Sequence, residues 1–126
     1  MRNRVDVKIY EPAYIHETAE IGRNTKIGAC CDIGEGVVIG KACNIQAQVT
    51  ISNGVKIGNG VFIAPDVHFL NDLYMNGLNQ PPTVGDYTRI GGSTIIFPDV
   101  HIGRNCFIGA GLKIRKSLPD GSIVLK

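Results

Sequence analysis

The chain has 126 residues, which predicts a single domain over residues 1–126. Its formal net charge of +2 does not indicate a general nucleic-acid-binding protein. No apolar run approaches the roughly 18 residues that suggest a membrane-spanning helix, and the charged start (Arg2, Arg4, Asp6, Lys8) does not resemble a signal peptide. We therefore expect a cytoplasmic protein that binds neither nucleic acid nor membrane.

Isoleucine recurs at a spacing of six through the first half of the chain. The ten positions are Ile9, Ile15, Ile21, Ile27, Ile33, Ile39, Ile45, Ile51, Ile57 and Ile63. A small or β-branched residue stands four places after each: Ala13, Ala19, Thr25, Cys31, Val37, Cys43, Val49, Val55, Val61 and Val67. Neither a helical period near 3.6 nor strand alternation gives strict sixes, so the pattern predicts a hexapeptide β-helix solenoid.

The strand rule explains how each hexad folds. The two apolar slots are an even number of residues apart, so both point inward from a short extended segment. Glycine directly after several isoleucines (Gly22, Gly28, Gly34, Gly40, Gly58) suits a tight corner, where a backbone without Cβ costs little. Three sides close a coil of 18 residues, and coils stack as parallel strands about 4.8 Å apart.

The first coils count as 9–26, 27–44 and 45–62, and a fourth opens at Ile63. Residues 1–8 precede the first hexad and are expected to cap the open end of the solenoid or to fray. Cys31, Cys43 and Cys106 occupy inward slots, and no C-x-x-C pair occurs, so we expect packing rather than disulfide or metal chemistry.

One stretch interrupts the repeat. Phe69 keeps the phase, residues 70–83 carry no hexad pattern, and the repeat resumes at Val84. An inserted loop on one face of a repeat protein often forms the binding surface. Coils 84–101 and 102–119 follow, then the turn signal Pro119-Asp120-Gly121 and a possible last strand in residues 122–126. The prediction is an all-β solenoid of about six coils.

Hexads broken once by a polar loop resemble the left-handed β-helix acyltransferases, from Ile9 to Lys116. The segment VFIAPDVHFLNDLY (61–74) resembles the loop entry of N-acetyltransferases that act on nucleotide-linked amino sugars, and residues 91–122 resemble their coenzyme A-binding coils. The resemblance implies a left-handed parallel β-helix, acetyl-CoA as co-substrate, and a homotrimer whose active sites lie between subunits.

The chain departs from the family pattern near the acceptor. Paired asparagines often follow the I-Q dipeptide in the family, whereas this chain has Gln46-Ala47-Gln48, so Gln46 and Gln48 are the candidates there. Met75 follows Tyr74 where the family usually has proline. The Gly-x-Pro-Ala segment that commonly follows the last coil does not occur in residues 117–126, so we expect a weaker or rebuilt coenzyme contact at that end.

Direct attack of an amine on a thioester needs a base for the amine proton and fixed donors for the oxyanion. His68 is the candidate base, because histidine's ordinary pKa lies nearest neutral pH and this side chain should point outward near the loop. Asp72 is expected to orient or replace it, with Asn71 and Tyr74 holding the acceptor. An ordinary exposed histidine is the alternative interpretation.

His16 and His101 are weaker candidates, each beside an inward isoleucine. Three histidines in such a solenoid also suggest the zinc site of γ-class carbonic anhydrases. That family has two ligands close together in sequence, and this chain has no such pair, so we expect no metal.

For the coenzyme, the glycine-rich corners let a pantetheine arm approach the backbone, and a basic cluster suits its phosphates. The candidates are Gly91, Gly92, Ala110, Gly111, Lys113, Arg115 and Lys116. A solvated basic rim is the alternative.

The leading hypothesis is acetyl-CoA-dependent N-acetylation of a nucleotide-linked amino sugar. An O-acetyltransferase of the same fold is the nearest rival, but relatives of that kind usually present a histidine within the loop, where this chain has Tyr74. A non-catalytic solenoid or assembly subunit is the alternative from a different class.

Overall fold

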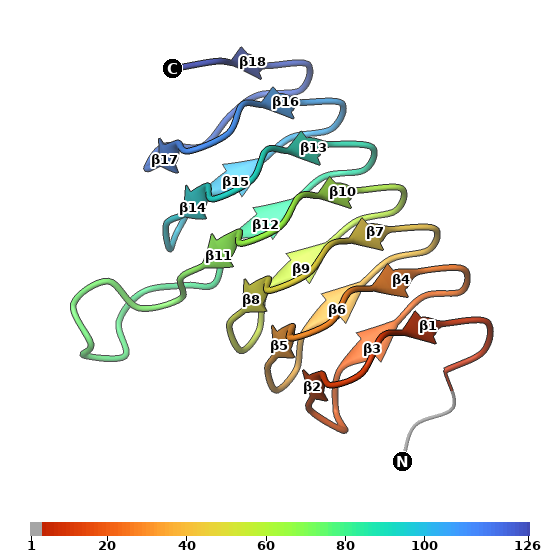
Figure 1. The fold of residues 1–126 in the computed structure, drawn as a ribbon. Helices are drawn as coiled ribbons and strands as arrows, with labels where there is room; N and C mark the ends of the chain where they lie inside the picture. Colours follow the sequence, from red (N-terminus) through yellow and green to blue (C-terminus); the bar gives the residue numbers. More distant parts are fainter. Residues whose placement is uncertain (1–3) are drawn as a thin grey trace.

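The computed structural model describes residues 4–126 as a three-sided solenoid of two-residue parallel strands (Figure 1). Sheet A contains β1 (Lys8–Ile9), β4 (Lys26–Ile27), β7 (Asn44–Ile45), β10 (Phe62–Ile63), β13 (Arg89–Ile90), β16 (Phe107–Ile108) and β18 (Ile123–Val124). Sheet B contains β2 (Tyr14–Ile15), β5 (Asp32–Ile33), β8 (Thr50–Ile51), β11 (His68–Phe69), β14 (Ile95–Ile96) and β17 (Lys113–Ile114). Sheet C contains β3 (Glu20–Ile21), β6 (Val38–Ile39), β9 (Lys56–Ile57), β12 (Thr83–Val84) and β15 (His101–Ile102).

The chain visits the sheets in the order A, B, C, and each round makes one coil, numbered here 1 to 6 from the N-terminus. Within a sheet, every strand pairs with the strand one coil later, as Ile9 pairs with Ile27. Coil 6 closes on sheet C through an isolated bridge between Ile102 and Leu118, and β18 then pairs with β16. The predicted left-handed parallel β-helix of about six coils, including a strand near its end, is confirmed.

The core consists of the two inward slots of each hexad. The isoleucine slots from Ile27 to Ile63 are at most 3% exposed. Cys31, Cys43 and Cys106 are buried and unpaired, as expected for packing, and burial raises the pKa of the Cys31 and Cys43 thiols. The solenoid is therefore stabilised mainly by continuous stacking of one apolar column on the next.

Buried threonines occupy some inward slots and connect neighbouring coils. The Thr88 hydroxyl donates to Gly103 O at 2.7 Å and accepts from Cys106 N at 3.1 Å. Thr25 makes the same pair of bonds to Gly40 and Cys43. Because both hydrogen-bonding roles of each hydroxyl are satisfied, these polar groups are accommodated in the core.

The glycine that follows many isoleucines serves a purpose different from the one predicted. Its φ is not positive; the left-handed residue of the corner stands two places later, as at Asn24, with φ of 64°. A Cβ on Gly22 would lie 2.5 Å from the backbone of Gly40 in the next coil. Close stacking of coils, rather than a strained turn, therefore requires glycine at this slot.

At the N-terminal end, Arg4 lies partly buried against coil 1. Its guanidinium donates to His16 O at 3.2 Å and Ala19 O at 3.3 Å. Arg4 thus covers part of the open end, as expected for residues that precede the first hexad, although residues 1–3 of that segment lie outside the described part.

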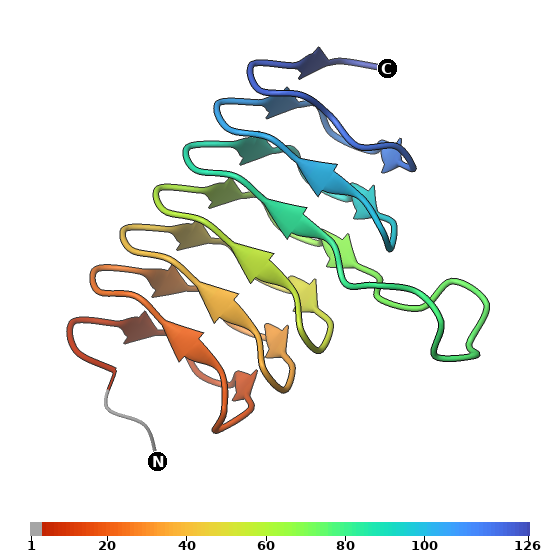
Figure 2. The same cartoon turned by 180° about the vertical axis from the view of Figure 1, so that it is seen from behind.

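The inserted loop leaves the solenoid between β11 and β12 and projects from its body (Figure 2). The predicted boundary of 70–83 is one residue too long, because Thr83 belongs to β12 and pairs with Lys56 and His101. Phe62 pairs with Arg89 across the insertion, so the loop lengthens one coil without shifting the register. No helix in residues 4–126 is long and apolar enough to cross a membrane.

Candidate active site

Most of the predicted site lies along one edge of the solenoid, where the chain passes from sheet A to sheet B. We call this edge the A–B corner; its later turns are residues 46–49, 64–67, 91–94 and 109–112. The left-handed residues of these turns form one row: Gln48, Asp66, Ser93 and Gly111. Asp66 N donates to Ala47 O at 3.1 Å, and Ser93 N donates to Pro65 O at 3.0 Å, so consecutive turns are in direct contact.

His68 stands beside this row, on the outer face of β11. Its Nε2 lies 2.9 Å from Asp66 Oδ1, and Ser93 Oγ donates to Asp66 Oδ2 at 3.0 Å. The hydrogen bonds from His68 and then Ser93 hold the pKa of the Asp66 carboxyl below its ordinary range. Because Asp66 is then ionised and accepts from Nε2–H, His68 Nδ1 is left as an acceptor with no partner in residues 4–126.

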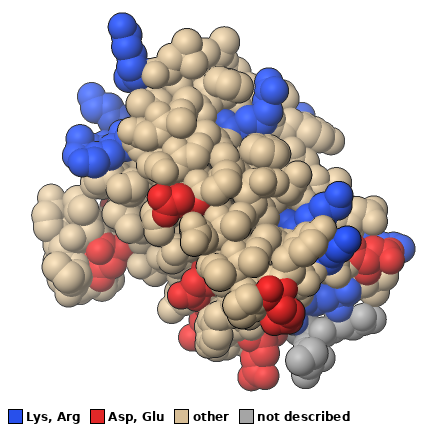
Figure 3. All heavy atoms as spheres, viewed as in Figure 1, with Lys and Arg blue, Asp and Glu red and all other residues tan. Residues whose placement is uncertain are grey.

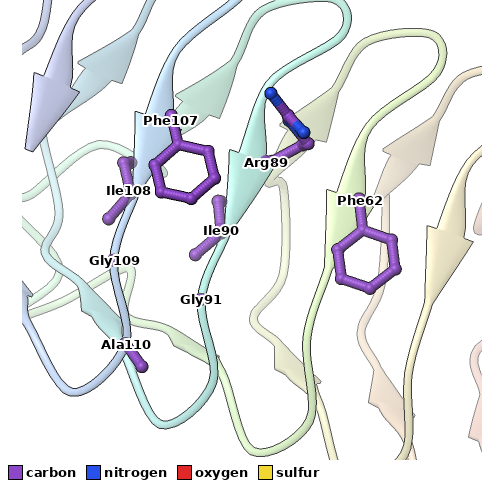
Figure 4. A pocket seen from close by; sticks show the side chains of 8 residues that line it. All are labelled: Phe62, Arg89, Ile90, Gly91, Phe107, Ile108, Gly109 and Ala110. Atoms are coloured by element: carbon purple, nitrogen blue, oxygen red, sulfur yellow. The ribbon is translucent and has the colours of Figure 1, made fainter.

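An open groove of ≈ 450 Å³ lies on the C-terminal half of sheet A and runs to the A–B corner (Figure 4). We call it the C-terminal groove; it is lined by Phe62, Arg89, Ile90, Gly91, Phe107, Ile108, Gly109 and Ala110. The Arg89 guanidinium lies 5.1 Å from the centre of the Phe107 ring. The groove thus combines aromatic walls, glycine-rich backbone and one cation, and it includes the predicted residues Gly91 and Ala110.

A second groove of ≈ 480 Å³ lies on the N-terminal half of the same corner. We call it the N-terminal groove; it is lined by Tyr10, Lys26, Gly28, Ala29, Asn44, Ile45, Gln46 and Ala47. It includes the predicted residue Gln46, whose Nε2 donates to Asn44 Oδ1 at 2.7 Å. Coil 4 separates the two grooves at this corner and carries Asp66 and His68.

The loop residues lie at the opposite edge of sheet B. Asn71 Nδ2 donates to Asn53 O at 3.2 Å, and Asn71 helps to line a polar pocket of ≈ 230 Å³ with Asp32, Gly34, Thr50, Ile51, Ser52 and Asn53. Tyr74 is 71% exposed. The pocket is on the same sheet face as His68, since His68 pairs with Thr50.

The predicted role of Asp72 as the partner of His68 is wrong for this structure. Asp72 accepts from Asn76 N at 3.2 Å and Gly77 N at 2.7 Å, so its carboxylate shapes the loop. The partner of His68 is Asp66, two residues earlier, because alternate residues of an extended segment share a face.

The predicted basic residues do not line the C-terminal groove. Lys113 is on β17 of sheet B, and Arg115 and Lys116 follow at the edge between sheets B and C. The Arg115 guanidinium lies 5.0 Å from the centre of the Phe97 ring. Within one subunit, the cluster is thus separated from Gly91 and Ala110 by the width of sheet B.

The other histidines have structural partners. His16 Nδ1 lies 2.8 Å from Thr18 Oγ1, and His101 Nδ1 lies 2.8 Å from Thr83 Oγ1. In residues 4–126 no three side chains of His, Cys, Asp or Glu are grouped to hold a metal ion.

Sequence reasoning did not identify Asp66 and Ser93, or the groove residues Phe62, Arg89 and Phe107. A signal for both sets existed. Once the excess length of the loop is subtracted, Asp66 and Ser93 fall in the same hexad slot of consecutive coils. Phe62, Arg89 and Phe107 likewise pair in register.

Comparison with known proteins agrees with this architecture. The model of the family "Bacterial transferase hexapeptide (six repeats)" matches residues 18–53 and 81–116. No curated protein sequence matches the chain.

Several solved structures share the fold. The acetyltransferase domain of PglB from Neisseria gonorrhoeae has 24% identity and a TM-score of 0.84, over 95% of this chain and 54% of that one. PerB from Caulobacter crescentus, in complex with CoA and GDP-perosamine, has 20% identity and a TM-score of 0.83, over 95% and 54%.

AntD, an N-acyltransferase from Bacillus cereus in complex with dTDP and 3-hydroxybutyryl-CoA, has 25% identity and a TM-score of 0.81, over 94% of this chain and 74% of AntD. The chain spans only about half the length of PglB and PerB. Because the family model covers more than half of its residues, the chain belongs to the bacterial hexapeptide transferase family.

Proposed function

We propose that the protein is an acyl-CoA-dependent acyltransferase that acetylates the amine of a nucleotide-linked amino sugar. The observation that carries the proposal is the meeting of two grooves at coil 4, beside the Asp66–His68 pair. Two substrates laid along one edge from opposite ends would join at this point. The family membership and the nucleotide-sugar ligands of PerB and AntD support the same assignment.

The coenzyme is assigned to the C-terminal groove. Its walls, Phe62 and Phe107, are apolar and partly exposed, which suits a pantetheine arm and an acyl group. Gly91, Gly92 and Gly111 would allow the arm to approach the corner closely. We assign the phosphates to Lys113, Arg115 and Lys116, across sheet B or on a neighbouring subunit.

His68 is the proposed general base, and it acts through Nδ1. As the amine nitrogen attacks the thioester carbonyl, its proton passes to Nδ1, and Asp66 stabilises the imidazolium. The tetrahedral intermediate then collapses, the C–S bond breaks, and the leaving thiolate takes the proton from His68. The products are an amide and free coenzyme A.

The grooves of a single subunit are open, and the loop carries an apolar surface that a neighbour would cover. Leu73, Tyr74, Met75 and Leu78 are between 40% and 88% exposed. We therefore propose a homotrimer in which the loop of one subunit, with Asn71 and Tyr74, completes the site of the next, while Gln46 and Gln48 contact the acceptor. Light scattering should then give a mass three times the 13.6 kDa of the chain.

The direct test is calorimetry with acetyl-CoA on Ala110→Trp. Ala110 is exposed and lines the C-terminal groove, so tryptophan there should fill the groove without disturbing the core, and binding should weaken at least tenfold. Glu17→Trp is the matched control, because Glu17 holds the same turn position on another corner of coil 1.

Turnover is measured as free thiol released with a dTDP-linked 4-amino sugar as acceptor. His68→Ala should lower kcat by a factor on the order of 10², the usual scale for a lost general base. The absence of acetyl-CoA binding by the folded wild-type protein would refute the proposal.

A further inference from the structure

The N-terminal groove has a pair of lysines on one wall. Lys8 and Lys26 are register partners on β1 and β4, so their side chains leave neighbouring strands about 4.8 Å apart on the same face. Lys8 Nζ lies 5.0 Å from the centre of the Tyr10 ring. Figure 3 shows basic side chains gathered at the lower right, over the region of β1 and β4.

No carboxylate neutralises this pair. Neither lysine forms an ion pair with any residue from 4 to 126; the nearby Arg23 does, with Asp6 at 2.9 Å. Like charges directly opposite each other on neighbouring strands are unfavourable. A bound anion with more than one negative charge would relieve the repulsion, so the wall suits a diphosphate.

The rest of the groove offers an aromatic ring and amide groups. Tyr10 is 46% exposed, which leaves ring surface for stacking. The bond between Asn44 and Gln46 uses one group of each amide and leaves Gln46 Oε1 and Asn44 Nδ2 free for a ligand. An aromatic ring, paired amides and two cations together match a nucleoside diphosphate better than a simple sugar or a free phosphate.

We propose that the N-terminal groove binds the nucleoside diphosphate part of the acceptor, with Lys8 and Lys26 on the phosphates and Tyr10 against the base. This inference rests on the proposed function. It also sets a direction: the sugar extends along the A–B corner toward coil 4, where His68 lies, and the acyl group arrives from the C-terminal groove.

The test is calorimetry with dTDP, UDP and GDP on the wild-type protein, Lys26→Gln and Tyr10→Ala. At least one nucleoside diphosphate should bind, and each substitution should weaken it at least tenfold while acetyl-CoA affinity stays unchanged. Lys56→Gln is the matched control, because Lys56 occupies the same outward slot on β9 of sheet C and is equally exposed. Raising the salt concentration should weaken binding to the wild type more than to Lys26→Gln.

The outcomes separate this inference from the proposed function. Acetyl-CoA binding without any nucleoside diphosphate binding would overturn the inference alone, as would nucleoside diphosphate binding that Lys26→Gln leaves unchanged. Nucleoside diphosphate binding that depends on Lys26 in a protein that fails to bind acetyl-CoA would support the inference and overturn the acyltransferase assignment.

Discussion

At the scale of single residues, the Asp66 carboxylate determines which nitrogen of His68 can act. Asparagine in its place would offer an N–H to Nε2 and favour the tautomer that carries its proton on Nδ1. We therefore expect Asp66→Asn to lower kcat by about 10²-fold, with the KM values of both substrates unchanged.

Nitrogen NMR of the His68 ring provides the second readout, because a purely structural role for Asp66 would not exchange the tautomer. Glu35→Gln, in an exposed turn at another corner, is the control and should retain full activity. If Asp66→Asn reduces activity while the His68 tautomer stays the same, Asp66 is not a positioning residue.

This pair also shows how far the sequence could predict the site. His68 was predicted because its residue type and its outward slot suffice to propose a base. Asp66 and Ser93 were missed because turn residues do not repeat, and their contact joins positions 27 apart in sequence. The choice of Asp72 followed a resemblance in sequence, whereas hydrogen bonding within the loop engages that carboxylate elsewhere.

A buried threonine provides a stability test at the same scale. Thr88→Val keeps the shape but removes the hydroxyl that accepts from Cys106 N and donates to Gly103 O. We expect a loss of about 1–3 kcal/mol in the free energy of unfolding, the cost of unsatisfied buried groups. Urea denaturation measures it, and Thr50→Val, on the outer face of sheet B, should change stability much less.

At the scale of elements, the loop is fixed at its return end by Asp99. The Asp99 carboxylate accepts from Gln80 N at 2.7 Å and from Asn79 Nδ2 at 2.8 Å. The hydrogen bonds from Gln80 and then Asn79 lower the pKa of Asp99. A lowered pKa means that the contribution is present above the ordinary value near 4 and is lost as the pH falls through the folded-state value.

The expected result follows from that sign. Hydrogen exchange of the amides in residues 79–82 should stay slow from pH 8 to pH 5 after correction for intrinsic rates, and Asp99→Gly should accelerate it several-fold. Glycine retains the positive φ of 65° at this position, so only the carboxylate is lost. Asn105→Gly, at another left-handed turn position, is the control; equal exchange in both variants would contradict the anchoring role.

The elements themselves were largely predictable. A strict spacing of six leaves no other regular structure, and each inward isoleucine fixes the register of its strand against the next coil. The grooves were not predictable in the same way, because they depend on outward residues such as Phe62 and Phe107, which the repeat does not constrain.

At the scale of the whole molecule, stability should vary along the axis of the solenoid. A central coil stacks on neighbours at both ends, whereas coil 1 has one coil beside it, and repeat proteins sum such nearest-neighbour terms. Ile63 in coil 4 is 0% exposed, while Ile15 in coil 1 is only partly buried.

Truncating the two side chains in parallel tests this gradient. Ile63→Ala should cost roughly 2–5 kcal/mol in the free energy of unfolding, and Ile15→Ala should cost clearly less, because its cavity is open to solvent and the end coil can adjust. Urea denaturation at fixed protein concentration measures both. Equal costs would show that the solenoid unfolds with no difference between end and centre. A gradient would place the most rigid part of the chain at coil 4, where Asp66 and His68 require fixed geometry.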